Sequence, residues 1–282
     1  MYIKQGHEEY LHNNDLKVRG PLAKYWTNTR VVELCLVEDL KYATHSGSGE
    51  SCCEMTLNFI GSSSKVQGQK FLLTLPDLDD SDTPDFLVER GWYDASMERN
   101  WSSRDKCQVW WTNPGGRDGS WWKGRSQSVN DQSNEFPGSP WKIFSVQYKN
   151  DEEEFNHCPW ELHDPAHLFE HSHIDRDRRK KMLSSFRKLL PSGPNKEDNY
   201  GILKLEQIAQ KSDFINRFPV PLSLDIIEKR LEKNYYRRME ALKYDINVML
   251  SNAQSYFDGN RTFSKKMKNL SHWFDELFLE LE

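Results

Sequence analysis

The sequence has few cysteines, and none is placed to pair with another or to fix a metal ion. The five lie at Cys35, Cys52, Cys53, Cys107 and Cys158, and no two have CxxC spacing. A disulfide scaffold or a structural zinc needs paired, suitably spaced cysteines, so the sequence favours neither and fits a reducing compartment.

Long apolar runs and enzyme signatures are also missing. No run of about 18 apolar residues occurs, so we expect no membrane span, and the first residues lack the basic and apolar regions of a secretory signal. The motifs GxSxG, the P-loop, GxGxxG after a strand and HExxH are all absent. The sequence therefore predicts a protein that is not an enzyme and has no cofactor.

One series of histidines could suit a metal site. His163, His167 and His171 are spaced by four residues, which would place them on one face of a continuous helix. Pro165 fits poorly inside such a helix. We therefore favour a polar linker here and expect no bound metal.

The formal net charge of −5 is unevenly distributed. Residues 1–167 hold 17 Lys and Arg against 26 Asp and Glu, whereas residues 168–282 hold 21 against 17. An acidic half suits a basic partner such as a histone tail, and a basic half could face the phosphates of nucleosomal DNA. Ordinary solvated surfaces would give the same counts, and the basic run Arg176–Lys181 has no interleaved aromatics.

The first half consists of short β-type segments. Nine of the ten tryptophans lie at or before Trp160, and turn-rich stretches separate the segments, which is typical of small barrels. A strand–turn–strand is also expected over Tyr2–Tyr10, and a helix over Asp85–Asn100. The expected strands are Arg30–Leu36, Cys53–Ile60, Lys70–Leu75, Cys107–Trp111, Trp121–Ser126 and Ile143–Tyr148.

The second half has helical periodicity. Helices are expected over Arg178–Leu190 and Leu222–Leu231. A third has apolar residues from Tyr235 to Tyr256 and a fourth from Phe263 to Leu281, spaced alternately by four and three. Such stripes face the core of a helix bundle.

Two of the expected strands carry adjacent tryptophans, Trp110-Trp111 and Trp121-Trp122. With Tyr148, which precedes an acidic turn, they resemble the Tudor barrel pattern, in which Trp111, Trp122 and Tyr148 would form a cage for methylated lysine. Aromatic faces attract the diffuse charge of a methylated ammonium by ~0.5–2 kcal/mol per ring. Strand alternation turns one ring of each pair inward, so the same rings could instead belong to the barrel core.

Other residues are secondary candidates for the cage or for contacts with the tail. They include two aromatics at Tudor-like positions of a preceding barrel, the second member of each tryptophan pair, and acidic residues that would steer a basic tail. They are Tyr10, Phe59, Trp110, Trp121, Asp151 and Glu153. We prefer the second barrel as the methyl-lysine site.

The second half resembles a bromodomain. Pro221–Leu231 is similar to the Pro-Met-Asp-Leu-x-x-Ile element of that family, and Asp245–Tyr256 to its Asn-x-x-x-Tyr-Asn element. Asn252 and Tyr256 match, but Phe257 stands where the family has the Asn that holds the acetyl carbonyl. Loss of that hydrogen bond would cost ~1–3 kcal/mol. The resemblance therefore implies a degenerate acetyl-lysine pocket.

Barrel, barrel and bundle in this order resemble the WD-repeat bromodomain family, which includes pleckstrin-homology-domain-interacting protein. The stretches similar to its cryptic-Tudor module include Gln5–Tyr10, Arg99–Trp101, Trp121-Trp122 and Pro159–Leu162. The resemblance implies residence in the nucleus, a partner in the histone H3 tail methylated on a lysine near its start, and WD repeats upstream. The divergent bundle suggests a plant member.

The predicted fold is multidomain, β then α: two small Tudor-like β-barrels followed by a left-handed four-helix bundle of the bromodomain type. The expected boundaries are 1–84 for the first barrel, 85–100 for a connecting helix, 101–165 for the second barrel and 166–282 for the divergent bromodomain. The predicted function is chromatin reading. The alternative is a non-histone interaction scaffold in which barrels and bundle dock together, with the tryptophans pointing into core.

Overall fold

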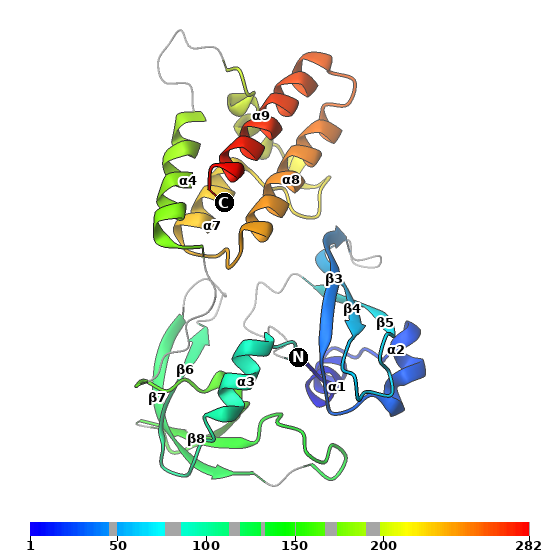
Figure 1. Cartoon of the computed structure of the whole chain (residues 1–282), viewed down its shortest axis with the longest axis vertical. Coiled ribbons are helices and arrows are strands. Elements are labelled where there is room, and N and C mark those ends of the chain that lie inside the picture. The colour runs from blue at the N-terminus through cyan, green and yellow to red at the C-terminus, as the bar shows by residue number, and fades with distance from the viewer. Residues whose placement is uncertain are drawn as a thin grey trace. The chain divides into compact units, whose positions relative to one another are not determined.

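The chain divides into two compact units, Met1–Glu170 and His171–Glu282. The computed structural model describes residues 1–44, 50–76, 86–112, 119–130, 133–149, 151–166, 174–189 and 198–281. The β-sheets lie in the first unit, and the second unit is helical (Figure 1). The architecture is therefore β then α, as the sequence predicted.

The first sheet is an antiparallel meander in the order β3-β4-β5. Its strands are Cys35–Thr44, Ser51–Phe59 and Lys70–Pro76. Alternation explains β5, where Phe71 and Leu73 are buried while Leu72 between them is 56% exposed. A short pair, β1 (Tyr2–Ile3) with β2 (Val32–Glu33), lies beside this sheet.

The N-terminal segment is helical beyond its third residue, and the predicted strand–turn–strand over Tyr2–Tyr10 is wrong. After β1 the chain forms α1 (Lys4–Asn13), and later α2 (Gly20–Tyr25) and the 3-10 turn η1 (Trp26–Asn28). The buried residues of α1 are Gly6, His7, Tyr10 and Leu11. This spacing is that of a helix face rather than of a strand.

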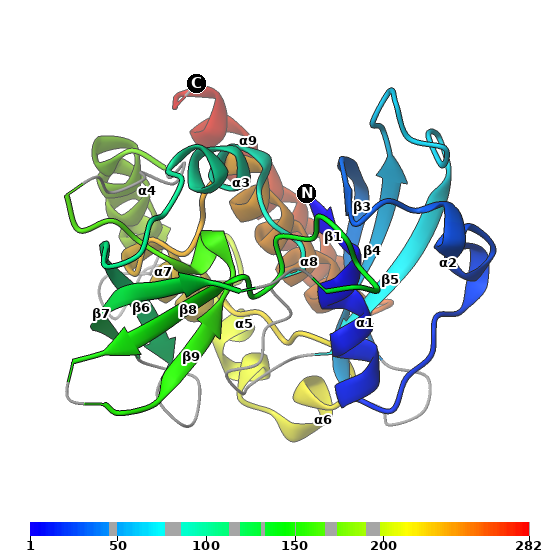
Figure 2. The ribbon, with the colours of Figure 1, turned by 90° about the horizontal axis from the view of Figure 1, so that it is seen from below.

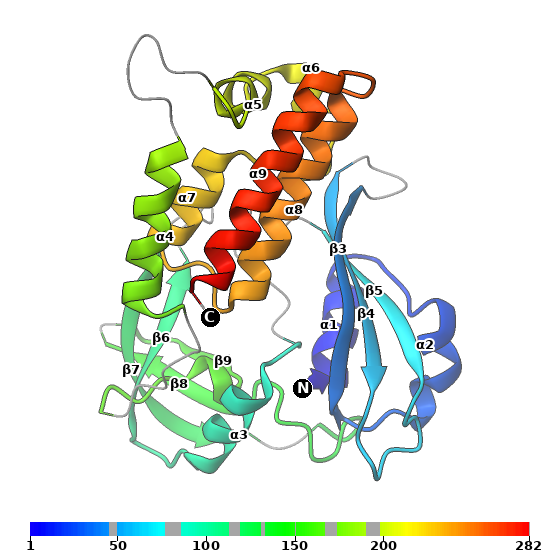
Figure 3. The same cartoon turned by 45° about the horizontal axis from the view of Figure 1, so that its top comes forward.

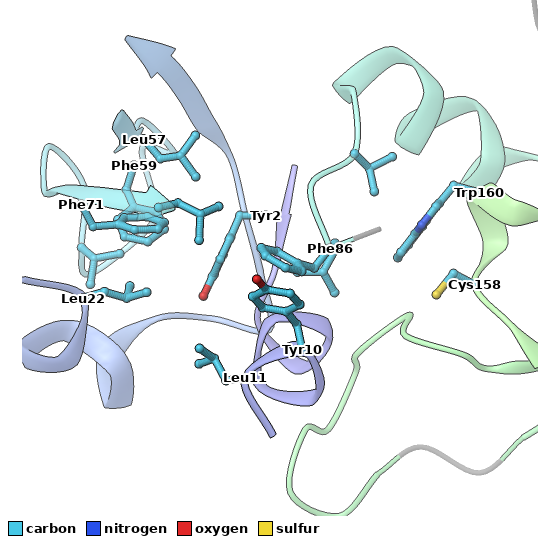
Figure 4. Packing of buried hydrophobic residues seen from close by; sticks show 14 residues of the cluster. Tyr2, Tyr10, Leu11, Leu22, Leu57, Phe59, Phe71, Phe86, Cys158 and Trp160 are labelled. Atoms are coloured by element: carbon cyan, nitrogen blue, oxygen red, sulfur yellow. The ribbon is translucent and has the colours of Figure 1, made fainter. Parts of the chain in front are cut away.

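Tyr10 and Phe59 belong to the core of the first sheet and are not cage residues. Phe59 has no exposed surface and Tyr10 is 9% exposed. Figure 4 shows Tyr2 between Phe59 and Phe71 on one side and Phe86 and Tyr10 on the other. Their faces are occupied by neighbouring rings, so neither could receive a ligand there.

The core of the first sheet also receives residues from the far end of this unit. Cys158 is fully buried and Trp160 is 5% exposed, and both belong to the same cluster as Tyr2 and Phe86 (Figure 4). Cys158 precedes the 3-10 turn η2 (Pro159–Glu161), and Trp160 lies within that turn. The Trp92 indole also donates a 2.9 Å hydrogen bond to the carbonyl of Trp160.

A glycine allows α1 to pack closely against the segment before β8. A Cβ on Gly6 would lie only 2.5 Å from the Trp141 ring. On the same helix, Glu9 accepts a 2.7 Å hydrogen bond from the Trp141 indole and pairs with Lys142. Both contacts would be lost if a larger residue replaced Gly6.

The second sheet is antiparallel in the order β6-β7-β8-β9 (Figure 2). Its strands are Lys106–Thr112, Gly119–Val129, Phe144–Tyr148 and Glu154–His157. The predicted helix before it begins later than expected: α3 covers Arg90–Glu98. Phe86 instead packs in the first core, and its carbonyl accepts a hydrogen bond from the amide of Ile3.

The second unit is a bundle in which α4, α7, α8 and α9 lie side by side, with α5 and α6 at one end (Figure 3). The four long helices are Arg176–Leu189, Leu224–Glu232, Met239–Tyr256 and Arg261–Leu279. The two short ones, α5 (Ile202–Ala209) and α6 (Ser212–Ile215), lie in a connection that the periodicity did not resolve. No helix in the described part of the chain is long and apolar enough to cross a membrane.

Most residues of the predicted apolar stripes are buried, whereas Met239 and Tyr256 are partly exposed and Tyr235 is misplaced. Tyr235 precedes α8 and is 59% exposed, whereas Tyr236 is 2% exposed. The hydroxyl of Tyr236 donates to the buried carboxylate of Asp245 at 2.7 Å, and Arg230 pairs with the same oxygen at 2.6 Å. Tyr236 therefore takes the core position because α8 supplies its hydrogen-bond partner.

Candidate functional site

Three predicted site residues lie on one face of the second sheet. Val109 in β6 is directly opposite Trp122 in β7, and Trp111 is two residues along β6, so both tryptophans project from the same face. Tyr148 in β8 joins them. The ring centroids are 6.1 Å apart for Trp111 and Trp122, 6.3 Å for Trp111 and Tyr148, and 5.8 Å for Trp122 and Tyr148. We call these three residues the aromatic cluster.

The cluster has two open sides and a buried base. Trp111 is 38% exposed and Trp122 47%, whereas Tyr148 is 3% exposed. Gly124 lies opposite Tyr148, and a Cβ there would come within 2.7 Å of the Val146 side chain, so glycine lets β7 and β8 approach. Burial raises the pKa of Tyr148, against a lowering by a hydrogen bond with Trp111, and the phenol is neutral.

Two residues of β9 pack against the aromatic cluster, and the sequence analysis did not predict either of them. The Phe155 ring lies 6.0 Å from that of Trp111 and 5.7 Å from that of Tyr148, between centroids. The corresponding values for His157 are 6.3 and 5.9 Å. The only signal in the sequence was the alternation of Phe155 and His157 within a four-residue strand.

A chain of hydrogen bonds runs away from the base of the cluster. The Tyr148 hydroxyl lies 2.7 Å from His157 Nε2, and His157 Nδ1 lies 2.8 Å from Glu161 Oε2. The same Glu161 oxygen accepts a 3.0 Å hydrogen bond from the amide of Cys158. The cluster is thus connected to η2 through polar side chains.

The other two tryptophans lie on the opposite face of the sheet. Trp110 and Trp121 are directly opposite each other, 5.2 Å apart between centroids, and are 48% and 44% exposed. The His163 ring lies 4.7 Å from Trp121 and 4.9 Å from Trp92. Trp110 and Trp121 therefore form a second aromatic surface and cannot line the same site as Trp111 and Trp122.

The acidic turn directly follows the cluster. The amide of Asp151 donates to the carbonyl of Tyr148 at 3.3 Å, and the Asp151 carboxylate accepts from the amide of Glu153 at 3.1 Å. Glu153 is exposed. The turn therefore places negative charge next to the buried base of the cluster.

The histidine series is only partly described. His163 stacks on Trp92 and meets Trp121 edge to face, while His167 and His171 lie outside the described residues. Among the residues that the structure describes, no group of three His, Cys, Asp or Glu side chains could hold a metal ion.

In the bundle, the residues of the expected acetyl-lysine pocket make contacts within the chain. The Asn252 amide donates to the carbonyl of Val220 at 3.1 Å, and the Tyr256 hydroxyl donates to Asp213 at 2.5 Å. That hydrogen bond raises the pKa of Tyr256 and lowers that of Asp213. Both matching residues thus hold the connection that precedes α7.

Phe257, at the end of α8, is covered by a lysine of its own chain. The Lys204 ammonium lies 4.0 Å from the Phe257 ring centroid and 5.1 Å from that of Phe263. Asn260, three residues later, accepts a 3.0 Å hydrogen bond from the amide of Phe263 as the N-cap of α9. The Oδ1 atom of Asn260 is thus used to cap α9.

Two family models match the chain, in the order that the sequence predicted. The BRWD/PHIP ancillary domain-like domain matches residues 1–173, and the bromodomain model matches residues 187–269. The chain belongs to the BRWD/PHIP ancillary domain-like family. Both domains of this BRWD/PHIP-like protein are reader or interaction modules rather than enzymatic families. The two matches support a chromatin-associated reader or interaction module of a kind typically found in the nucleus, with histones or chromatin as partners.

Proposed function

We propose that the second sheet binds a methylated lysine of a histone tail, near the N-terminus of histone H3, through the aromatic cluster. The observation that carries this proposal is the group of three adjoining rings, two of them open to solvent. Within the described residues, the cations that lie over aromatic rings cover other residues, such as Trp26, Trp101 and Phe257. The exposed surfaces of Trp111 and Trp122 are therefore open to an external cation.

The spacing of the rings suits a methylated ammonium. The ring planes meet at 52°, 72° and 84°, and the centroids are 5.8–6.3 Å apart. Cation–π attraction acts within roughly 6 Å of a ring centroid, so a cation bound at one of these rings would lie close to the others. Phe155 is placed to extend the site on the Tyr148 side.

Charge also favours a histone tail. Asp151 and Glu153 lie three and five residues after Tyr148, and a basic tail would be attracted to this acidic turn. The methyl groups favour the aromatic site because a methylated ammonium is poorly hydrated and loses little by leaving water. Attraction of the tail and recognition of the methyl groups then come from adjoining parts of one sheet.

The proposal includes a bundle that does not read acetyl-lysine. A neutral amide needs a hydrogen-bond donor for its carbonyl, and a donor missing in a buried site costs roughly 1–3 kcal/mol. Phe257 has no polar group, and Asn252, Tyr256 and Asn260 donate or accept within the chain. The bundle then serves another partner or has a structural role.

A second candidate function is an interaction scaffold for a non-histone protein. The exposed pair of Trp110 and Trp121 favours it, because large exposed aromatics are characteristic of interaction surfaces. This surface lies on the opposite face of the sheet from the cluster, so the two functions can be tested separately.

The decisive experiment is a calorimetric titration of the whole chain with H3 N-terminal peptides that are unmodified, lysine-methylated or lysine-acetylated. We expect binding only to the methylated peptide. Trp122→Ala should weaken it about 2- to 30-fold, the effect of losing one ring of ~0.5–2 kcal/mol. Trp121→Ala is the matched control, because it removes the adjacent tryptophan from the opposite face.

Three results would contradict the proposal. Equal binding of all peptides, or of none, would exclude the cage and favour the scaffold. Equal losses of affinity in the two tryptophan variants would show that the peptide contacts the surface of Trp110 and Trp121, or that both variants are misfolded. A preference for the acetylated peptide would show that the bundle has kept its ligand despite Phe257.

A further inference from the structure

We propose that His157 and Glu161 are positioning residues for the aromatic cluster, acting through a buried hydrogen-bond chain that ends on Tyr148. This inference rests on the proposed function. The chain runs from Glu161 to His157 to Tyr148, over distances of 2.8 and 2.7 Å. The polar end of each side chain in this series points to the next residue.

The direction of the chain follows from Glu161. Its Oε2 atom accepts from the amide of Cys158 as part of a capping box on η2. An ionised carboxylate can only accept hydrogen bonds, so the proton between the two side chains belongs to Nδ1 of His157. The Nε2 atom of a neutral His157 is then an acceptor, and the Tyr148 hydroxyl is its donor.

Burial gives the chain its effect. The side chains of His157 and Glu161 are 8% and 20% exposed, and Tyr148 is 3% exposed. Hydrogen bonds between such groups are stronger than in water, and each unsatisfied member would be costly. The hydroxyl of Tyr148 therefore stays on His157, which fixes the direction of the Tyr148 ring.

The fixed ring in turn places the rest of the site. His157 contacts the rings of both Trp111 and Tyr148 nearly at right angles, at 86° and 82°. The Trp111 and Tyr148 rings also contact each other edge to face, with centroids 6.3 Å apart. Two sides of the cluster are thus held before a ligand arrives, which lowers the ordering cost of binding.

Tyr148→Phe tests the chain, because this substitution keeps the ring and removes only the hydroxyl. We expect affinity for a lysine-trimethylated H3 N-terminal peptide to fall about tenfold. Tyr2→Phe is the matched control: the Tyr2 hydroxyl makes a 2.8 Å bond to His7 in the same unit, away from the cluster. It should cost similar stability and leave the affinity unchanged. A Tyr148→Phe affinity equal to that of the unaltered protein would overturn the proposal.

Glu161 distinguishes positioning from general stability. In Glu161→Gln the amide oxygen can still accept from both Cys158 and His157, so we expect affinity within about threefold of the starting value, whereas Glu161→Ala should lose about tenfold. In a double-mutant cycle, His157→Gln should add little to Tyr148→Phe, because both break the same bond. Full additivity would contradict a shared chain.

One readout needs no ligand. Long-range nitrogen–proton NMR spectra of the histidines should show His157 protonated on Nδ1, and the Trp111 indole signal should move in Tyr148→Phe while that of Trp110 does not. A proton on Nε2 would overturn the proposed direction. If the spectra agree but no methylated peptide binds, the proposed function fails while the hydrogen-bond chain stands.

Discussion

The aromatic cluster of the second sheet and the rings at the end of α8 in the bundle differ in whether a cation of the chain covers them. In the bundle the faces of Phe257 and Phe263 are taken by Lys204, at 4.0 and 5.1 Å. In the sheet, two tryptophans with 38% and 47% exposure have no such internal cation among the described residues. A ring that already holds a cation of its own chain adds stability, whereas an uncovered ring can bind an external one.

The two regions also differ in how their polar groups are used. In the bundle, Asn252 and Tyr256 tie the end of α8 to the preceding connection. In the sheet, the polar chain through His157 points toward the rings and supports them. The comparison teaches that a residue matching a family pattern, such as Asn252, can hold the fold through contacts within the chain.

The largest expected effect is a loss of stability of the bundle that leaves binding at the second sheet unchanged. Asp245→Ala should destabilise the bundle by about 3–5 kcal/mol, because it leaves the half-buried Arg230 and the buried Tyr236 without their shared acceptor. Chemical denaturation followed by circular dichroism at the helical signal measures it. Asp225→Ala, which breaks only the exposed pair with Lys229, should cost less than about 1 kcal/mol. A loss of methyl-peptide affinity in folded Asp245→Ala would break the comparison.

The next largest effect is a dependence of the stability of the first unit, Met1–Glu170, on pH. Burial lowers the pKa of His7 to about 4 from its ordinary 6.5. The unfolded chain therefore binds a proton in this interval that the folded chain does not, and stability falls as pH drops from 6.5 toward 4, by up to about 3 kcal/mol. Tryptophan fluorescence during unfolding reports on this unit, because it holds nine of the ten tryptophans.

A variant identifies the source of this pH dependence. His7→Gln should flatten the curve between pH 6.5 and 4, whereas His12→Gln, on the exposed side of the same helix, should not. An unchanged slope in His7→Gln would assign the effect to other groups.

The smallest expected effect concerns the covering lysine. Lys204→Met keeps the aliphatic stem and removes the charge above Phe257, and should destabilise the bundle by about 0.5–1 kcal/mol. Lys268→Met, an exposed position on α9, is the control. Denaturation midpoints compare the two, and equal shifts would mean that the cation over Phe257 contributes nothing to the contrast drawn above.

The sequence was informative wherever one periodicity extended over many residues. Most residues in the stripes of α8 and α9 are buried, and the first three strands of the second sheet lie where alternation predicted. The segment of α1 was predicted as strand–turn–strand, although its buried residues Gly6, His7, Tyr10 and Leu11 have the spacing of a helix face. Tyr235 and Tyr236 were interchanged because the start of α8 was placed too early.

The site was less predictable than the fold. Trp111, Trp122 and Tyr148 could be named from a pattern, but their membership of one face follows from a strand register that spacing alone does not give. Phe155, His157 and Glu161 were missed because β9 and η2 are four and three residues long. Short elements carry little periodic signal, and here they hold the support of the cluster.

The burial of Trp160 and Cys158 in the core of the first sheet has a consequence for how the sheet unit melts. A chain that ended before residue 158 would leave the cluster around Tyr2 and Phe86 without part of its cover. In the whole chain, unfolding of either sheet would therefore remove packing from the other. The two sheets should lose structure in one cooperative transition, and shortened versions that stop after the first sheet should behave as partly collapsed, protease-sensitive chains.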